Sequence, residues 1–269
     1  MLMVTVLGAC AMSPQKLAYR DRLEAGISSP EDIERFKTTE REQSALIADA
    51  RSMPPRRAQA GDIQLIQAAA TGDTVRMAAL LTSGAHVNAV DAQNQNALLV
   101  AARAGEVEGV RLLLKAGAYA DGRGGTMPPL AAAALRGHTM VVRLLIRNGA
   151  DVDGVGENAQ SALMNAVKLK HLGVVQVLIE AGASQQVLDR AGDNLLTVAV
   201  TENNPEMLAL LLRLGVSPDL ADSNGLTALY WAEYLKRPEL ALLLRKAGAD
   251  PLRKKTELIV SQPYNFGEF

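Results

Sequence analysis

The sequence predicts an all-α fold, a solenoid of six helix–loop–helix repeats with β-hairpin turns between them and a helical N-terminal extension. A leucine-rich segment followed by Gly-Ala or Gly-Val recurs with its glycine at spacings of 33, 32, 33, 33 and 33 residues. A fixed period of this size is typical of solenoids, in which each repeat buries its apolar face against its neighbours. The composition agrees, because 48% of the residues are hydrophobic and only 3% are aromatic, which favours thin helical layers of Leu, Ala and Val. The recurring glycines are Gly84, Gly117, Gly149, Gly182, Gly215 and Gly248.

One period, residues 96–117, shows how a repeat is built. It splits into two short helices with a turn at Ala104 and Gly105, because apolar residues recur at helical spacing on both sides of this turn. Gly117 follows the second helix, where a residue with positive φ ends a helix without a steric penalty. The expected buried faces consist of Leu98, Ala101 and Ala102 in the first helix and Val110, Leu113 and Leu114 in the second.

Three of the hairpins between repeats begin with an aspartate, Asp91, Asp189 or Asp222. An aspartate at this position can accept hydrogen bonds from the backbone of its own turn. The residue three positions later is Asn or Gly, which tolerates the left-handed region. Each repeat is therefore predicted to run hairpin, helix, loop, helix.

These repeats resemble the ankyrin repeat, whose pattern runs D-x-x-G-x-T-P-L-H-x-A-A-x-x-G-H and then V-V-x-L-L-L-x-x-G-A-D-V-N. The segment DSNGLTALYWA, residues 222–232, resembles the first half, and RGHTMVVRLLIRNGADVD, residues 136–153, resembles the second. The chain is thereby identified as a member of the ankyrin repeat family over residues 62–251. The resemblance implies an ankyrin repeat solenoid that binds a protein partner and uses no cofactor.

The chain departs from the ankyrin pattern at two positions of the first helix. At the Thr position, which caps this helix, it has Asn96, Pro128, Ser161, Asn194 and Thr227. Asn and Ser cap helices well, so most caps are expected to survive. At the His position, whose hydrogen bonds in the family are lost here, the chain has Leu99, Ala131, Met164, Thr197 and Tyr230. The 32-residue spacing indicates a missing residue in the hairpin at residues 122–125, which we expect to be irregular and mobile.

Residues 1–10 resemble the end of a bacterial lipoprotein signal. An apolar run leads into Leu7-Gly8-Ala9-Cys10, which resembles the lipobox, where a signal peptidase cuts before a cysteine that then carries the lipid. Cys10 is the only cysteine, and the run is too short for a membrane span, which needs ~20 residues. The resemblance implies a lipid-anchored protein on the periplasmic face of a bacterial envelope. Because no basic residue precedes the run, a start further upstream and the ragged N-terminus of a cytoplasmic protein both stay open.

Residues 11–60 form a charged helical extension and linker that differ in character from the repeats. Ser29-Pro30-Glu31-Asp32 is a helix-start pattern, so we expect a helix over residues 30–51 that covers the edge of the first repeat. Residues 52–57 contain two prolines and are the expected flexible joint. The ankyrin repeat domain follows over residues 61–251, and residues 252–269 form a tail or a C-terminal cap.

We find no catalytic constellation and no metal or cofactor site in the sequence. Residues 154–159 fit the G-x-G-x-x-A dinucleotide pattern, but they fall in a hairpin and not between a strand and a helix of a parallel sheet. His138 and His171 lie one period apart at the starts of second helices, where a histidine is structural, and no Cys or third His joins them. A net charge of −1 gives no general attraction for nucleic acid. The membrane is reached only through a possible lipid on Cys10.

The resemblance implies that a partner contacts the hairpin tips and the concave face formed by the exposed side of the first helices. Carried over one repeat at a time, the expected partner-binding residues are Gln93, Gln95, Arg103, Met127, Arg136, Glu157, Asn158, Gln160, Lys168, Arg190, Asp193, Glu202, Asn224, Leu226 and Tyr234. Aromatic residues gather late in the sequence, at Tyr230, Trp231, Tyr234, Tyr264, Phe266 and Phe269. They form either an interface hot spot or a cap in which the tail folds back onto the last repeat.

We therefore expect a noncatalytic, monomeric protein-binding module whose partner the sequence does not identify. One finer alternative is an immunity protein that inhibits a toxic periplasmic enzyme, a role of some ankyrin lipoproteins that this chain resembles. Another is a stress-related scaffold with several weak partners. An enzyme would need a site built across repeats, for which the sequence offers no clustered His, Cys or acidic residues.

Overall fold

The computed structural model describes residues 56–122, 127–155 and 161–251. Several expectations lie outside these residues: lipidation of Cys10, the helix over residues 30–51, most of the hairpin at residues 122–125, and the late aromatic residues Tyr264, Phe266 and Phe269. The chain divides into two compact units, Met1–Ser184 and Gln185–Phe269. Each unit is described by itself.

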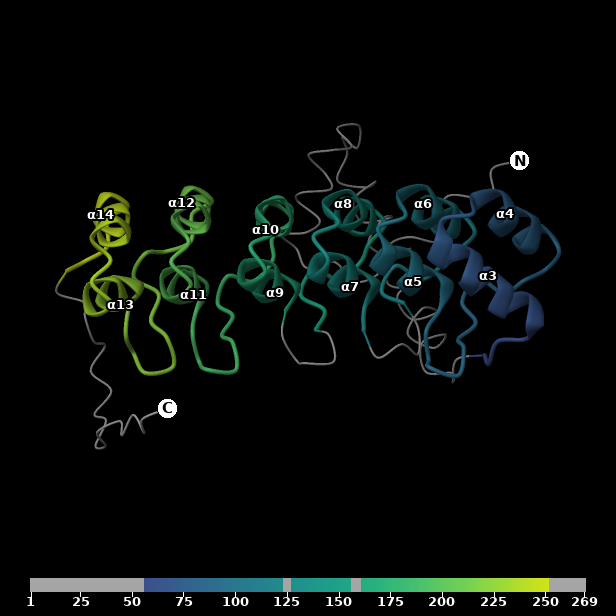
Figure 1. Cartoon of the computed structure of the whole chain (residues 1–269), viewed down its shortest axis with the longest axis horizontal. Helices are drawn as coiled ribbons and strands as arrows, with labels where there is room; N and C mark the ends of the chain where they lie inside the picture. Colours follow the sequence, from purple (N-terminus) through teal and green to yellow (C-terminus); the bar gives the residue numbers. More distant parts are fainter. Residues whose placement is uncertain (1–55, 123–126, 156–160, 252–269) are drawn as a thin grey trace, which may run out of the picture. The chain divides into compact units, whose positions relative to one another are not determined.

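Twelve helices and no strand are found among the described residues (Figure 1). The N-terminal unit contains α3 (Ala60–Thr71), α4 (Thr74–Thr82), α5 (Ala97–Ala104), α6 (Val107–Lys115), α7 (Pro129–Leu135), α8 (Thr139–Arg147), α9 (Ala162–Lys168) and α10 (Leu172–Glu180). The C-terminal unit contains α11 (Leu195–Thr201), α12 (Pro205–Arg213), α13 (Ala228–Tyr234) and α14 (Pro238–Lys246). The prediction of an all-α fold with two helices per repeat is confirmed.

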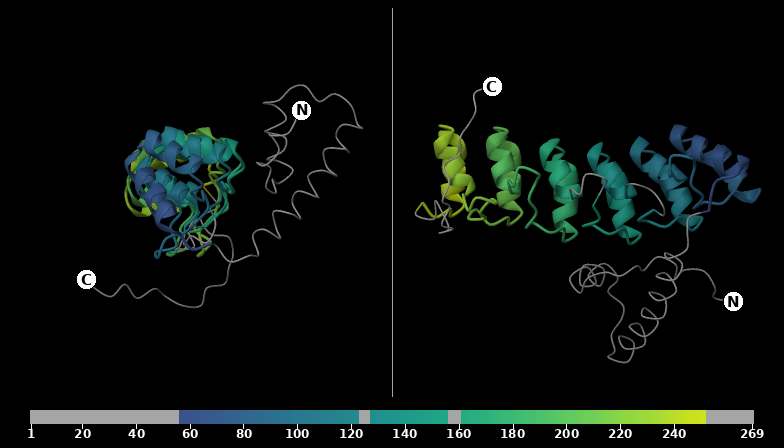
Figure 2. Two further views of the ribbon diagram at one scale, coloured as in Figure 1. Left: turned by 90° about the vertical axis from the view of Figure 1, so that its right-hand side faces the viewer. Right: turned by 90° about the horizontal axis from the view of Figure 1, so that it is seen from below.

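The helices of each unit form two layers. In the N-terminal unit the first helices α3, α5, α7 and α9 pack in sequence, and α4, α6, α8 and α10 form the second layer (Figure 1). Figure 2 shows the same helices from below, where those of successive repeats lie side by side. In the C-terminal unit α11 packs against α12 and α13, and α14 packs against α12 and α13. Helices of 7 to 12 residues are marginal alone, since an isolated helix needs ~12–15 residues, so stacking supplies their stability.

The buried faces match the expected residues. Leu98, Ala101 and Ala102 on α5 and Val110 and Leu113 on α6 are at most 1% exposed, while Leu114 is half-buried. Small residues let neighbouring first helices approach closely, as in α7, whose four consecutive alanines are all buried. Gly105 and Gly117 have φ of 83° and 89°, as the predicted helix ends require.

The loop that joins the second helix of one repeat to the first helix of the next is here called a finger. Figure 1 shows that the fingers project on the side of the first helices. Antiparallel bridges Val155↔Ser161, Leu188↔Asn194 and Ala221↔Thr227 close three fingers at their bases. These bridges confirm the expected hairpins, although no bridge is long enough to count as a strand among the described residues.

The aspartates of the finger turns make the predicted hydrogen bonds. Asp222 Oδ1 accepts from the backbone N–H of Asn224 at 2.8 Å and of Leu226 at 2.9 Å. Asp91 and Asp189 make the equivalent pairs of bonds. The left-handed residues that follow are Asn94, Gly192 and Gly225. Each turn is therefore held by one carboxylate.

The first helices are capped at their N-termini largely as predicted. The side chains of Asn96, Ser161, Asn194 and Thr227 each accept a hydrogen bond from a backbone N–H in the first turn. Pro128 makes no such bond. Three of the four substitutions at the Thr position of the family pattern, and the threonine retained at Thr227, thus preserve the cap.

Arg56 and Arg57, just before the first repeat, pair through their backbone with the first finger. Arg57 forms a parallel bridge with Val90, Ala58 donates to the carbonyl of Val90 at 2.8 Å, and Val90 donates to that of Arg56 at 3.0 Å. The Arg57 guanidinium also donates to the carbonyl of Asp91. Of the joint expected at residues 52–57, the two described residues are therefore held against the first finger. Pairing across one whole repeat has no local sequence signal, which is why the expectation differed.

His138 and His171 hold adjacent repeats together. The Nε2 atom of His138 lies 3.2 Å from the carbonyl oxygen of Arg103, and that of His171 lies 3.2 Å from the carbonyl oxygen of Leu135. Arg237 takes the same place in the C-terminal unit, where its guanidinium donates to the carbonyls of Val200 and Thr201. Each side chain contacts carbonyl oxygens near the C-terminus of the first helix in the preceding repeat. Carbonyls at this end of a helix have no hydrogen-bond partner within the helix. These contacts support the scaffold role expected for the histidines.

Candidate functional site

Six of the expected partner-binding residues lie in the described part of the N-terminal unit. Gln93, Arg103 and Arg136 are exposed, whereas Gln95, Met127 and Lys168 are half-buried. Gln93 and Gln95 flank the tip of the first finger, and Arg103 donates to Gln95 Oε1 at 3.1 Å. This contact joins the finger to the end of α5. Glu157, Asn158 and Gln160 lie outside the described residues.

The cations at the ends of the first helices occupy two different positions of the repeat. Arg103 lies in the last turn of α5 and Lys168 is the last residue of α9. Arg136 is the residue after α7, so the true equivalent of Arg103 in that repeat is Leu135. Arg136 therefore lies one position later in its repeat than Arg103 and Lys168 do in theirs. Arg136 is nevertheless exposed, and it follows α7, which packs against both α5 and α9.

The C-terminal unit carries the other six expected residues. Arg190, Glu202 and Tyr234 are exposed, and Asp193, Asn224 and Leu226 are half-buried. Asn224 and Leu226 donate their backbone N–H groups to Asp222, as described above, so the last finger presents both side chains from a fixed turn. Glu202 follows α11 in the position that Arg136 takes after α7.

Tyr230, Trp231 and Tyr234 form an aromatic cluster on α13. The rings of Tyr230 and Tyr234 stack with centroids 6.1 Å apart and 8° between their planes. Trp231 meets both edge-on, at 5.8 and 5.9 Å. Tyr234 is 60% exposed, and Tyr230 and Trp231 are half-buried. The cluster is therefore presented at the surface and is not a sealed core.

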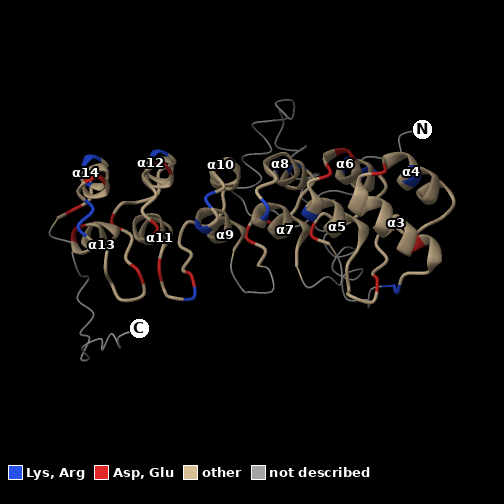
Figure 3. Cartoon of the chain, viewed as in Figure 1, with Lys and Arg blue, Asp and Glu red and all other residues tan. Residues whose placement is uncertain are grey.

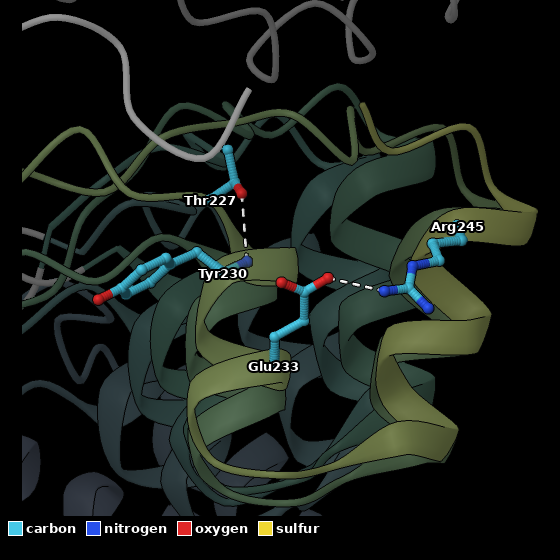
Figure 4. A network of polar contacts seen from close by, with 4 residues as sticks. All are labelled: Thr227, Tyr230, Glu233 and Arg245. Atoms are coloured by element: carbon cyan, nitrogen blue, oxygen red, sulfur yellow. Dashed lines mark hydrogen bonds and ion pairs between the residues drawn. The ribbon is translucent and has the colours of Figure 1, made fainter. Parts of the chain in front are cut away.

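Polar contacts fix the helix that carries the aromatic cluster. The indole Nε1 of Trp231 donates to Oδ2 of the buried Asp222 at 2.8 Å. Figure 4 shows the cap of α13, where Tyr230 donates its backbone N–H to Thr227, and the ion pair that joins Glu233 to Arg245 of α14 at 2.7 Å. These contacts restrain the helix that presents the three rings.

Sequence reasoning missed several exposed apolar residues. Val155 and Leu188 are 55% and 49% exposed at equivalent positions of two fingers, and Leu169 is 46% exposed after α9. The signal that could have found the first two is their spacing of one period, with an apolar residue just before each turn. Sequence reasoning also missed the hydrogen bond from the indole of Trp231 to Asp222.

The described residues contain no group of three or more His, Cys, Asp or Glu side chains placed to hold a metal ion. In the part of the chain that the structure covers, no helix is long and apolar enough to cross a membrane. The exposed features are thus finger tips, cations and aromatic rings, which are groups that suit recognition of another macromolecule.

Comparisons with known proteins point to one family. The family model for ankyrin repeats, which describes three copies, matches residues 120–189 and 163–255. An ankyrin repeat domain from Acinetobacter baumannii AYE is 30% identical with a TM-score of 0.63, covering 69% of this chain and 98% of that chain. The human ASB11 ankyrin repeat domain is 28% identical with a TM-score of 0.60, covering 69% and 84% of the two chains. The comparison with curated proteins finds no match.

Proposed function

This chain belongs to the ankyrin repeat family, and we propose that it is a noncatalytic, monomeric module that binds a protein partner through its finger tips and first helices. Ankyrin repeats in general indicate protein–protein interaction. The residues proposed to make the contact are those described above in each unit, with Arg103 and Arg136 in the first and Tyr234 in the second.

The aromatic cluster is the observation that carries this proposal. Tyr and Trp are enriched in interface hot spots because they bury a large area at low conformational cost. Here Tyr234 is 60% exposed although it stacks on Tyr230. For the three aromatic residues that the structure describes, packed rings with an exposed edge favour an interface hot spot over a C-terminal cap.

The proposal is tested by affinity capture from the source organism, with the full chain carrying Cys10→Ser as bait. Tyr234→Ala should remove the captured partner, while circular dichroism stays helical. Leu242→Ala is the matched control, because Leu242 is 51% exposed on the second helix α14 and lies outside the proposed surface. Equal capture by wild type and Tyr234→Ala, or equal losses in both variants, would contradict the proposed surface.

We further propose that the module is held at a bacterial envelope by a lipid on Cys10. The support is the segment Leu7-Gly8-Ala9-Cys10 and its resemblance to a lipobox. Mass spectrometry of the membrane fraction, after expression with the upstream coding region, should show an acylated Cys10. An unmodified chain in the soluble fraction would contradict this localisation.

Two finer roles differ in the number and strength of partners. An immunity protein would capture one toxic enzyme tightly, at one-to-one stoichiometry, and would inhibit it. A stress-related scaffold would capture several partners weakly. Quantitative mass spectrometry of the captured material, followed by titration of the main partner, separates these roles.

A further inference from the structure

One buried carboxylate holds both the last finger and a ring of the aromatic cluster. Asp222 is 6% exposed, and its Oδ2 accepts the indole N–H of Trp231 at 2.8 Å. Its Oδ1 accepts the backbone N–H groups of Asn224 and Leu226, which close the turn of the finger. The finger tip and the aromatic helix α13 are therefore joined through a single side chain.

The bond to the indole occurs in one repeat and is not needed to hold the turn. Figure 3 shows acidic residues in the fingers that lead into α11 and α13. Asp91 and Asp189 hold their own turns through the same pair of bonds. At the position that Trp231 takes in the last repeat, their repeats have Val100 and Val198, which are buried and carry no side-chain donor. The contact between carboxylate and indole is thus an addition to the turn.

The indole packs against both tyrosine rings of the cluster. The centroid of Trp231 lies 5.8 Å from that of Tyr230 and 5.9 Å from that of Tyr234, with interplanar angles of 83° and 88°. Rings that meet edge to face attract each other. Tyr234 is exposed, and its ring also lies nearly parallel to that of Tyr230. The orientation of Trp231 therefore restricts the orientations that are open to Tyr234.

We propose that Asp222 is a positioning residue of the partner-binding surface, which acts through Trp231 to hold Tyr234 in its binding orientation. Because Asp222 is buried, it does this without touching the partner. A side chain that is held before binding loses less conformational freedom when the partner arrives. This inference rests on the proposed function and adds the buried group on which the contact by Tyr234 depends.

Three substitutions in the full chain separate this role from general stability. Asp222→Asn keeps an amide oxygen for the turn but replaces Oδ2 by an NH₂ donor, so the indole loses its acceptor. Asp189→Asn is the matched control, because it makes the same change in the equivalent turn of the same unit, where Val198 replaces the tryptophan. Trp231→Phe keeps a ring and removes the N–H. Far-ultraviolet circular dichroism checks that each variant is folded.

The position of the ring is measured without a partner, by ¹⁹F NMR of the chain labelled with 3-fluorotyrosine. The chain has five tyrosines, and Tyr234→Phe assigns the signal of Tyr234. We expect Asp222→Asn to shift or broaden this signal and Asp189→Asn to leave it unchanged. In a chain that already carries Trp231→Phe, Asp222→Asn should have no further effect. A Tyr234 signal that Asp222→Asn leaves unchanged, or that Asp189→Asn alters equally, would overturn the inference.

The effect on binding is measured with the protein that wild type captures from the source organism. We expect Asp222→Asn to raise the Kd about three- to tenfold. In a chain that carries Tyr234→Ala it should raise the Kd no further, because its effect runs through that ring. An equal rise in both backgrounds would indicate general loss of stability and contradict the positioning role.

Failure of this inference differs from failure of the proposed function. If Tyr234→Ala binds as tightly as wild type, the surface proposed for the C-terminal unit is wrong, and the positioning role falls with it. If Tyr234→Ala loses binding but Asp222→Asn does not, the surface stands and only the role of Asp222 is wrong.

Discussion

Thr197 is a buried threonine whose hydroxyl has no hydrogen-bond partner. It lies in the first turn of α11 with no exposed surface. A buried hydroxyl without a partner costs about 1–3 kcal/mol, and valine fills nearly the same space without the polar atom. We expect Thr197→Val to raise the free energy of unfolding of the C-terminal unit by ~1 kcal/mol. Urea denaturation followed by circular dichroism measures the change.

Thr227 supplies the matched control for that substitution. It is also buried, but its side chain accepts the N–H of Tyr230 and caps α13 (Figure 4). Thr227→Val should lower the free energy of unfolding by ~1 kcal/mol, because valine cannot cap a helix. If the two threonine-to-valine substitutions change the free energy of unfolding in opposite directions, the hydroxyl of Thr227 has a hydrogen-bond partner and that of Thr197 has none. If both substitutions destabilise equally, the assignment of Thr197 is wrong.

Gly137 combines a positive φ with a close neighbour. Its φ is 76°, and a β-carbon there would lie 2.8 Å from Nδ1 of His171. We expect Gly137→Ala to destabilise the N-terminal unit by ~2 kcal/mol or more, from the left-handed conformation and the contact together. Gly182→Ala is the comparison, since its φ is 85° with no atom near the added carbon. If both variants lose the same free energy of unfolding in denaturation experiments, the contact with the His171 imidazole adds nothing to the cost of Gly137→Ala.

At the scale of single residues, the sequence predicts those hydrogen bonds that join residues close together along the chain. The caps at Asn96 and Asn194 and the turn at Asp222 could be predicted because each hydrogen bond closes within four residues. The missing partner of Thr197 could not, because it depends on which side chains the next helices place around it.

At the scale of one element, Asp222 ties a finger to the helix that follows it. One carboxylate oxygen holds the turn and the other accepts the indole N–H of Trp231. Asp222→Ala should lower the free energy of unfolding by ~2–3 kcal/mol, because it leaves three partly buried donors without their acceptor. It should also shift the fluorescence of Trp231, which is the only tryptophan of the chain.

Asp189→Ala is the control for this prediction. Asp189 holds the preceding turn through the N–H groups of Ala191 and Asp193, and the position equivalent to Trp231 in the helix that follows is Val198. Asp189→Ala should therefore lower stability and leave the emission of Trp231 unchanged. A shift of similar size in both variants would mean that Trp231 responds to general loosening and not to its own bond.

The helices could be predicted to within a residue or two because the apolar period repeats six times. The orientation of side chains at their ends could not be predicted as well. Arg103 and Lys168 are equivalent, whereas Arg136 lies one position later and Leu135 takes the equivalent place. Glu202 after α11, with no shortened finger before it, shares the position of Arg136.

At the scale of the whole molecule, the described domain begins before its first helix. Residues 56–58 pair with Val90, and Gln59 forms a capping box with Asp62. A chain that starts at residue 56 keeps these contacts and serves as the reference. A chain that starts at residue 60 should lose ~1–3 kcal/mol, because several backbone hydrogen bonds and a cap disappear. Equal stability of both chains would contradict a structural role for residues 56–59.

The fold class and the number of repeats could be predicted because the repeats share one pattern. The pairing of Arg57 with Val90 could not, since it joins residues one full period apart and has no apolar alternation. The same holds for Asp121 and Asp153, whose carboxylates reach the following finger. Contacts between repeats are set by stacking, and a single repeat does not encode them.

Gly105 and Gly137 each lie against an imidazole that belongs to the following repeat. A β-carbon at Gly105 would come within 2.6 Å of the His138 ring. In the last three repeats the equivalent position is occupied by Lys170, Asn203 or Lys236. These residues also have positive φ, although none of them is glycine. Recombination that exchanged whole repeats at the end of the second helix would separate each glycine from its histidine. A repeat transplanted by itself would therefore bring a glycine without its imidazole or an imidazole without its glycine.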